Sequence, residues 1–216
     1  MEITWYGHSC FRLMERGLAT VVTDPFDHNV AGYEPLKLKA DIITVSHNAP
    51  GHNFVSAVKG VSHVINGPGE YEIGGVFING VQTDGHGKKN GDKPRNTLYV
   101  FDYNGLTIAH LGDLRQVPPQ AEIEALGTVH IALVPVGSGG ALNAAKAAEI
   151  VSLLEPNIVI PMHYATPAAK VELDSLSKFL KEMGLGESPH QPSFSVKRLS
   201  DLPDETRLVV LDYQTG

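Results

Sequence analysis

The stretch Asp41-Ile42-Ile43-Thr44-Val45-Ser46-His47 decides the fold, because a short buried strand there runs directly into a metal-capable side chain. Its residues are apolar and β-branched, which is typical of a strand covered on both faces. The same arrangement occurs twice downstream, where residues 106–109 lead into His110-Leu111-Gly112-Asp113 and residues 158–160 lead into Pro161-Met162-His163. Ligands bind beyond the carboxyl ends of strands in open sheets, so the three strand ends predict one shared site.

Outward from these strands, the pattern predicts strands first and then strands that alternate with helices. Strands are expected over residues 3–6, 10–14, 19–23, 41–46, 61–65, 97–103, 106–111, 131–136, 157–161 and 207–212. Residues 72–83 are expected to form a strand or a hairpin around Gly74-Gly75. Helices are expected over residues 53–59, 118–126, 144–155 and 171–183. Asn104-Gly105 predicts a tight hairpin, and Asn143 predicts a helix N-cap. A length of 216 residues suits one domain over residues 1–216.

The composition excludes several classes of protein. The net charge is −7 and no Lys/Arg cluster occurs, which argues against a nucleic-acid partner. No apolar run approaches the roughly 20 residues of a membrane span, and the first residues lack the pattern of a signal peptide. The single cysteine, Cys10, excludes an internal disulfide framework and an all-cysteine zinc site. We therefore expect a cytoplasmic protein without a membrane partner, in which any metal site uses histidine and aspartate.

The ten histidines of the chain contain candidates for such a site. His47 and His52 flank a Pro-Gly turn and form half of a zinc site, since zinc usually takes at least three protein ligands. Asp113 follows a strand and can ligate one metal or bridge two, and His86 lies in a Gly-rich loop. His163 ends the third strand. The alternative interpretation is that these histidines are ordinary capping or surface residues.

Five segments in series resemble the metallo-β-lactamase superfamily. They are Gly7-His8-Ser9-Cys10-Phe11, Thr23-Asp24-Pro25-Phe26, Ser46-His47, His110-Leu111-Gly112-Asp113 and Pro161-Met162-His163-Tyr164. The match is similar to the small single-domain branch of ascorbate-6-phosphate-lactonase-like, Zn-dependent hydrolases. The resemblance implies an α+β fold, the αββα four-layer sandwich in which helices flank two mixed β-sheets. It also implies a metal site of one or two Zn²⁺ or Mn²⁺ ions at one edge, with small members often forming homo-oligomers.

The chain departs from the family's H-x-H-x-D-H motif at two positions. His47 and His52 match its first and last histidines, but Ala49 and Gly51 stand where the middle histidine and the aspartate are expected. The resemblance leaves His47, His86 and Asp113 for one metal, and His52, His163 and Asp113 for the other. His86 lies one residue later than the family's register. Each site has lost one ligand, so the metal would bind weakly or be absent.

Other residues are expected to support this site. Asp24 would orient an imidazole, and His8 and His110 would act from outside the ligand set. A turn-capping role before Pro25 is equally compatible with Asp24, and a packing role is equally compatible with His8. Asp113 is the catalytic candidate because it would touch the metal. Ser138 and Gly139, in the loop 137–140, would offer backbone N–H groups to a small, anionic substrate, unless this Gly-rich loop simply turns the chain.

Two functions from different classes follow. In the first, a metal-activated water attacks an ester, lactone or phosphoester. In the second, the protein is a degenerate member that keeps the fold and the cleft as a binding module, because Ala49 and Gly51 remove ligands and the usual base. A third possibility is that these two residues are engineered or strain-specific changes in an otherwise active protein.

Overall fold

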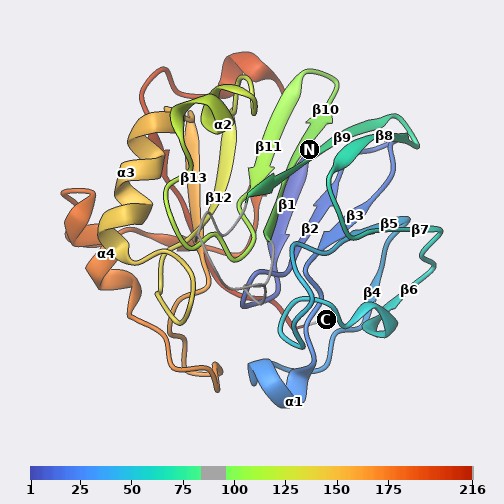
Figure 1. Cartoon of the computed structure of the whole chain (residues 1–216), viewed down its shortest axis with the longest axis horizontal. Helices are drawn as coiled ribbons and strands as arrows, with labels where there is room; N and C mark the ends of the chain where they lie inside the picture. The colour runs from blue at the N-terminus through green and yellow to red at the C-terminus, as the bar shows by residue number, and fades with distance from the viewer. Residues whose placement is uncertain (84–95, 216) are drawn as a thin grey trace, which may run out of the picture.

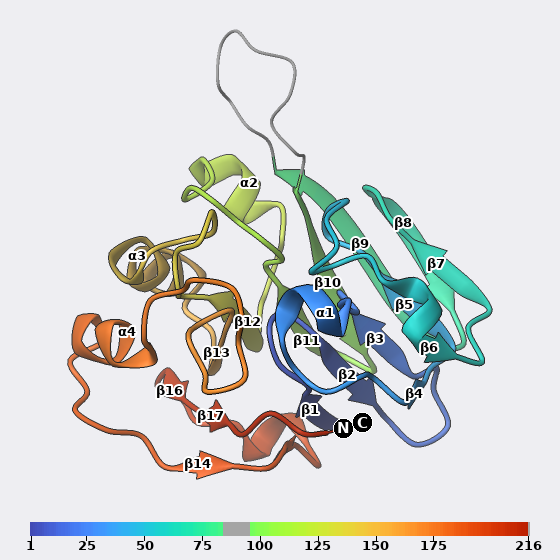
Figure 2. The same cartoon turned by 90° about the horizontal axis from the view of Figure 1, so that it is seen from below.

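The computed structural model describes residues 1–83 and 96–215, and its framework is a pair of facing β-sheets (Figures 1 and 2). The six-stranded sheet has the order β15 (Phe194–Ser195), β1 (Glu2–Trp5), β2 (Phe11–Met14), β3 (Val21–Thr23), β5 (Ile42–Thr44) and β7 (His63–Ile65). Strands β1, β2 and β3 form an antiparallel meander, whereas β3, β5 and β7 are parallel. As a result β1, β3 and β5 all end at the same edge of this sheet.

The seven-stranded sheet combines an antiparallel and a parallel half. Its order is β16 (Arg207–Leu208), β13 (Ile158–Met162), β12 (Ile131–Pro135), β11 (Leu106–His110), β10 (Asn96–Tyr103), β9 (Val76–Thr83) and β8 (Gly69–Ile73). The predicted hairpin at Asn104-Gly105 joins β10 and β11, and both turn residues adopt positive φ. From β11 to β16 all neighbours are parallel. Two small pairs, β4 (Leu38–Lys39) with β6 (Val58–Lys59) and β14 (His190–Gln191) with β17 (Val210–Leu211), complete the strands described.

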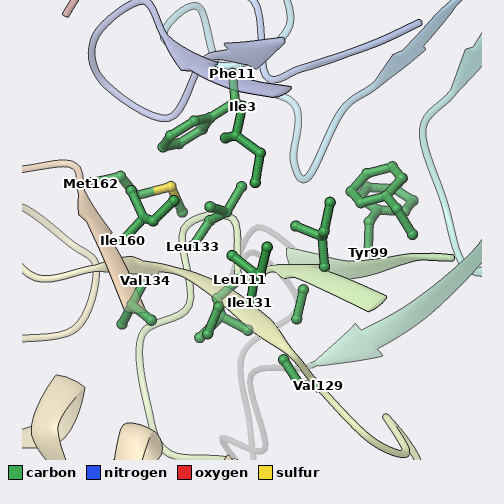
Figure 3. Packing of buried hydrophobic residues seen from close by; sticks show 14 of the residues in the cluster. Ile3, Phe11, Tyr99, Leu111, Val129, Ile131, Leu133, Val134, Ile160 and Met162 are labelled. Atoms are coloured by element: carbon green, nitrogen blue, oxygen red, sulfur yellow. The ribbon is translucent and has the colours of Figure 1, made fainter. Parts of the chain in front are cut away.

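Apolar side chains from both sheets fill the space between them. Figure 3 shows Ile3 and Phe11 of the first sheet facing Leu133, Ile160 and Met162 of the second, and all five are fully buried. Burying a side chain of this size contributes about 1.5–3 kcal/mol relative to leaving it exposed. The packed core therefore holds the strand ends, and the loops that leave them, in fixed relative positions.

Helices cover the two outer faces unequally. The seven-stranded sheet carries α3 (Ala144–Leu154) and α4 (Leu176–Glu182) beside β12 and β13, with α2 (Gln120–Glu124) next to them (Figure 2). Asn143 is the N-cap of α3, as predicted, because its side chain accepts a hydrogen bond from the Lys146 N–H. The outer face of the six-stranded sheet is covered by the four-residue α1 (His28–Ala31), by an apolar loop that supplies Phe26, Tyr33 and Leu36, and by Leu38 and Val58 of the β4–β6 pair. The α+β sandwich with two mixed sheets is thus confirmed, with one helical layer reduced.

The helix predicted over residues 53–59 is wrong. The chain forms one 3₁₀ turn, Val55–Ala57, and then extends into β6, which pairs with β4. Phe54 at the N-cap position offers no capping side chain, and β-branched Val55 and Val58 favour the extended conformation. The last predicted helix is also shorter than expected, since α4 begins at Leu176. Among the described residues, no helix is long and apolar enough to cross a membrane.

Candidate metal centre

Four buried imidazoles meet where the ends of the two sheets converge. His8 follows β1, His47 and His52 follow β5, and His163 follows β13, and none is more than 8% exposed. Each ring packs against the next in the order His47, His52, His8 and His163. The ring centroids are 4.1 Å apart for His47 and His52, 4.7 Å for His8 and His52, and 4.3 Å for His8 and His163. The topology therefore brings together side chains that are up to 155 residues apart.

Three of these imidazoles form a tighter group. Each of His8, His52 and His163 offers one ring nitrogen, and the three nitrogens all lie within 4.8 Å of one another. The Nε2 atoms of His8 and His52 are 3.2 Å apart. His8, which the sequence places outside the ligand set, thus lies inside the group.

Asp24 fixes the orientation of His52. It is completely buried after β3, and its carboxylate accepts hydrogen bonds from His52 Nδ1 (2.9 Å), the Ser46 N–H (2.7 Å) and Ser46 Oγ (2.6 Å). Burial alone would raise the pKa of Asp24, but the hydrogen bond from His52 and the nearby His110 imidazole hold that pKa below its ordinary value. A carboxylate can only accept, so Nδ1 of His52 carries the proton and its Nε2 lone pair faces the other imidazoles.

Asp113 lies between His47 and His163. Its Oδ2 is 3.7 Å from His47 Nε2 and its Oδ1 is 3.9 Å from His163 Nε2. The Asp113 N–H donates to Asn96 Oδ1 (2.9 Å), and Arg115 donates to Asp113 Oδ2 (3.0 Å). The Asp113 carboxylate thus faces the imidazoles on both sides of it.

Burial favours the neutral form of three of these imidazoles, those of His8, His47 and His163. Desolvation is the main cause that lowers the pKa of His47 and of His163 to about 4, and the neighbouring His52 lowers both further. Burial, followed by repulsion from His163 and His52, holds the pKa of His8 well below its ordinary value. A neutral imidazole has a lone pair available, which is the form that binds a metal ion.

His110 supports the loop that carries His8. It is fully buried, its Nε2 donates to the Ser9 carbonyl (2.9 Å), and its Nδ1 accepts from the Gly112 N–H (3.2 Å). Burial lowers the pKa of His110, so the ring is neutral and its two nitrogens take these opposite roles. The side chain therefore ties the loop after β1 to the end of β11.

Strained backbone is concentrated at the same place. Among described residues other than glycine, six have positive φ, and four of these are His8, Asp24, Ser138 and His163. Each such conformation costs on the order of 1–3 kcal/mol, and residues of this kind cluster at functional sites. The His8 carbonyl accepts from both the Trp5 indole N–H (3.1 Å) and the His163 N–H (3.0 Å), which helps to hold this arrangement.

The loop 137–140 approaches His163 closely. A Cβ on Gly137 would lie 2.3 Å from the His163 carbonyl oxygen, and one on Gly139 would lie 3.7 Å from His163 Cε1. The Ser138 N–H already donates to the Leu142 carbonyl (3.0 Å), and Ser138 Oγ donates to Asp174 (2.6 Å). Ser138 thus shapes the loop, and Gly139 lies nearer to the imidazoles. His86 falls outside the described residues.

A cleft and the guanidinium group of Arg115 border the cluster. Neither Arg115 nor the carboxamide residues of the cleft were among the predicted site residues. The cleft has a volume of about 590 Å³, opens beside His47 and carries four carboxamides, those of Asn48, Asn53, Asn66 and Gln82. Arg115 has a 42% exposed side chain, and its Nη2 would lie 3.8 Å from a Cβ on Gly140. Its place two residues after Asp113 is the only sequence signal that could have identified it.

The residues present fit a divalent metal ion. Neutral imidazoles with one carboxylate are the donor set that zinc prefers. Two buried ring nitrogens in the cluster, Nδ1 of His8 and Nδ1 of His163, have no hydrogen-bond partner within the described part of the chain. An unpaired buried polar atom costs about 1–3 kcal/mol, and the described residues leave both rings with one ring nitrogen that no protein group uses.

Comparison with known proteins places this cluster in a family. The family model described as the β-lactamase superfamily domain matches residues 2–163. A UPF0173 metal-dependent hydrolase of Thermoplasma acidophilum is 30% identical, with 77% of this chain and 84% of the relative covered. A Thermotoga maritima protein of the metallo-β-lactamase superfamily is 34% identical, with a TM-score of 0.77 and 97% of each chain covered. Igni18, a metallo hydrolase of Ignicoccus hospitalis, shares the fold at 19% identity and a TM-score of 0.66, with 91% of this chain and 99% of Igni18 covered. The chain belongs to the metallo-β-lactamase superfamily.

Proposed function

We propose that this protein is a metal-dependent hydrolase of a small, anionic ester, lactone or phosphoester. The observation that carries the proposal is the convergence of four buried imidazoles and Asp113 at one edge of the sandwich. The name of the Thermoplasma relative, a metal-dependent hydrolase, supports the same reaction class. The buried, unpaired thiol of Cys10 agrees with a reducing compartment, and we place the protein in the cytoplasm.

The residues around Asp113 would hold the metal. His52 and His163 would bind it on one side and His47 on the other, with Asp113 within reach of both. Zn²⁺ or Mn²⁺, as one or two ions, would lower the pKa of a bound water and polarise the substrate oxygen. Asp24 keeps the proton on Nδ1 of His52 and so keeps its Nε2 lone pair free.

The opposite wall of the site would bind the substrate. Arg115 is partly exposed, and its guanidinium can form bidentate hydrogen bonds to a carboxylate or phosphate. Gly140 leaves open space beside this guanidinium, since a Cβ there would meet only Arg115 Nη2, at 3.8 Å, whereas the space beside Gly139 is filled by Leu173. The carboxamides of the adjoining cleft suit a substrate with further hydroxyl or amide groups.

A non-hydrolytic binding module is the second candidate, and a specific observation favours it. Position 51 is glycine, so no carboxylate there can position or deprotonate a water. Position 49 is alanine, and its methyl group coordinates nothing. The fold, the cleft and Arg115 would then serve to bind an anionic small molecule without cleaving it.

One assay separates the two candidates. The metal-free protein is loaded with Zn²⁺ or Mn²⁺ and offered a panel of chromogenic phosphodiesters, lactones and esters. We expect turnover that is lost on chelation and falls at least about 100-fold in His163→Ala, as removal of a metal ligand requires. The control His190→Ala removes an exposed histidine paired with Asp212 and should change nothing. Stoichiometric metal binding without turnover of any substrate would favour the binding module.

A further inference from the structure

We infer that His8 is itself a metal ligand, and that Gly51 is glycine because the His8 ring occupies the space that a side chain at position 51 would need. This inference rests on the metal dependence proposed above. It assigns His8, His52 and His163 as a three-imidazole site. In this ligand set the His8 imidazole takes the place of the carboxylate that position 51 lacks.

The His8 ring occupies the space beside Gly51. A Cβ built on Gly51 would lie 2.9 Å from His8 Nε2, closer than Cβ atoms come in proteins, and 3.3 Å from its Cδ2, which is tighter than most Cβ contacts. Gly51 is buried and does not have a positive φ, so its backbone does not require glycine. What excludes a side chain is therefore the imidazole of His8.

The Nε2 atoms of His8 and His52 are spaced as two ligands of one zinc ion would be. Two nitrogens bound to one tetrahedral Zn²⁺ at about 2.0–2.1 Å lie about 3.3 Å apart. The Nε2 atoms of His8 and His52 are 3.2 Å apart, and Asp24 holds the His52 proton on the far side of the ring. The third nitrogen, from His163, lies within 4.8 Å of both.

Hydrogen bonds from other segments hold the backbone around His8 in place. Its carbonyl accepts hydrogen bonds from the Trp5 indole and the His163 amide, and the next residue, Ser9, is bound by His110. His8 keeps a positive φ under these restraints. A purely packed histidine would not need these three contacts to hold it in a strained conformation. A ligand does need a fixed orientation.

This ligand set predicts which metal binds and how many ions each chain holds. Imidazole suits zinc, whereas carboxylate and water suit manganese, so a three-imidazole site selects Zn²⁺ over Mn²⁺. Three protein ligands leave one position for water or substrate, which is the pattern of catalytic zinc. On the other side, the described residues supply His47 and Asp113 alone, so we expect one tight ion per chain.

The test measures zinc affinity with a competing chromophoric chelator and counts the bound imidazoles by X-ray absorption. For the wild-type protein we expect about one equivalent of Zn²⁺ and about three imidazoles. In His8→Ala the affinity should fall about 100-fold or more and one imidazole should disappear. His190→Ala is the matched control, an exposed histidine whose loss should leave both measurements unchanged.

Position 51 provides an independent arm of the same test. Gly51→Ala adds one methyl group against the His8 ring and should weaken zinc binding at least about tenfold, although no ligand is removed. Gly51→Asp should do the same in the wild-type background. In the His8→Ala background, however, it should restore affinity at least about tenfold, because the carboxylate then fills the vacated space. If His8→Ala fails to fold, Gly51→Ala carries the test.

The outcomes are distinct. Wild-type protein that takes up less than about a tenth of an equivalent of Zn²⁺ overturns the proposed metal dependence and this inference together. Wild-type binding that His8→Ala leaves within about threefold, with the same number of imidazoles, overturns the inference alone. Unchanged binding in Gly51→Ala also overturns it, since the space argument then fails.

Discussion

The two sides of the site differ in how firmly they are built. On one side, His8, His52 and His163 are at most 4% exposed and are anchored through Asp24 and through main-chain hydrogen bonds. On the other side, His47 borders an open cleft and Arg115 is 42% exposed. Rigid, desolvated imidazoles suit a resident ion, whereas exposed polar groups suit a ligand that comes and goes.

The largest expected effect is a loss of stability at low pH in the metal-free protein. The unfolded chain binds protons near pH 6.5, whereas burial lowers the pKa of folded His47 and His163 to about 4. Between these values the unfolded state holds more protons, so stability is full above pH 6.5 and is lost as the pH falls toward 4. Each shift corresponds to an upper limit of roughly 3 kcal/mol.

Denaturant unfolding in the presence of chelator, from pH 8 down to pH 4, measures this effect. His163→Gln should flatten the slope of stability against pH by up to about one proton. The control Asn143→Ala removes the N-cap of α3 and should lower the whole curve by about 1 kcal/mol without changing its slope. A wild-type curve that is flat over this range would contradict the prediction.

The second largest effect is expected for Asp24, the residue that orients His52. Asp24→Asn keeps the size of the side chain but replaces a carboxylate that accepts from His52 Nδ1 and twice from Ser46. We expect a loss of about 3 kcal/mol in the free energy of unfolding and zinc binding weakened about 10–100-fold. Chemical denaturation and chelator competition measure the two quantities.

Asp27→Asn is the matched control for that change, because Asp27 caps α1 near the surface by accepting from the Asn29 N–H. Its loss should cost no more than about 1 kcal/mol and leave zinc binding unaltered. Equal effects of Asp24→Asn and Asp27→Asn on zinc would show that Asp24 has no part in orienting His52.

The smallest effect belongs to the open side. Arg115→Gln should weaken binding of inorganic phosphate to the zinc-loaded protein about tenfold, or about 1.4 kcal/mol, while zinc affinity stays within about threefold. Titration calorimetry measures both. Arg198→Gln, which changes an exposed arginine elsewhere on the surface, is the control. A large loss of zinc from Arg115→Gln would instead assign Arg115 to the metal side of the site through Asp113.

Much of the fold could be predicted because local signals and tertiary packing agree. The strand 42–44, the hairpin at Asn104-Gly105 and the capped helix at Asn143 all follow from periodicity or turn chemistry, and all are observed. The failure at residues 53–59 has the opposite cause. A short segment with modest helical preference was overruled when its end paired with β4, a contact 20 residues away in the chain.

The features of the site likewise fall into those that the sequence predicts and those that only the tertiary structure reveals. The sequence by itself determined that His47, Asp113 and His163 follow strands, and parallel strands bring such residues to one edge. Only the tertiary structure decided that His8 lies among the imidazoles, that its ring fills the space beside Gly51, and that Arg115 borders the same cluster. The physical reason is that a strand pattern specifies where a side chain leaves the sheet, whereas contacts between loops of two sheets depend on packing that no local pattern encodes.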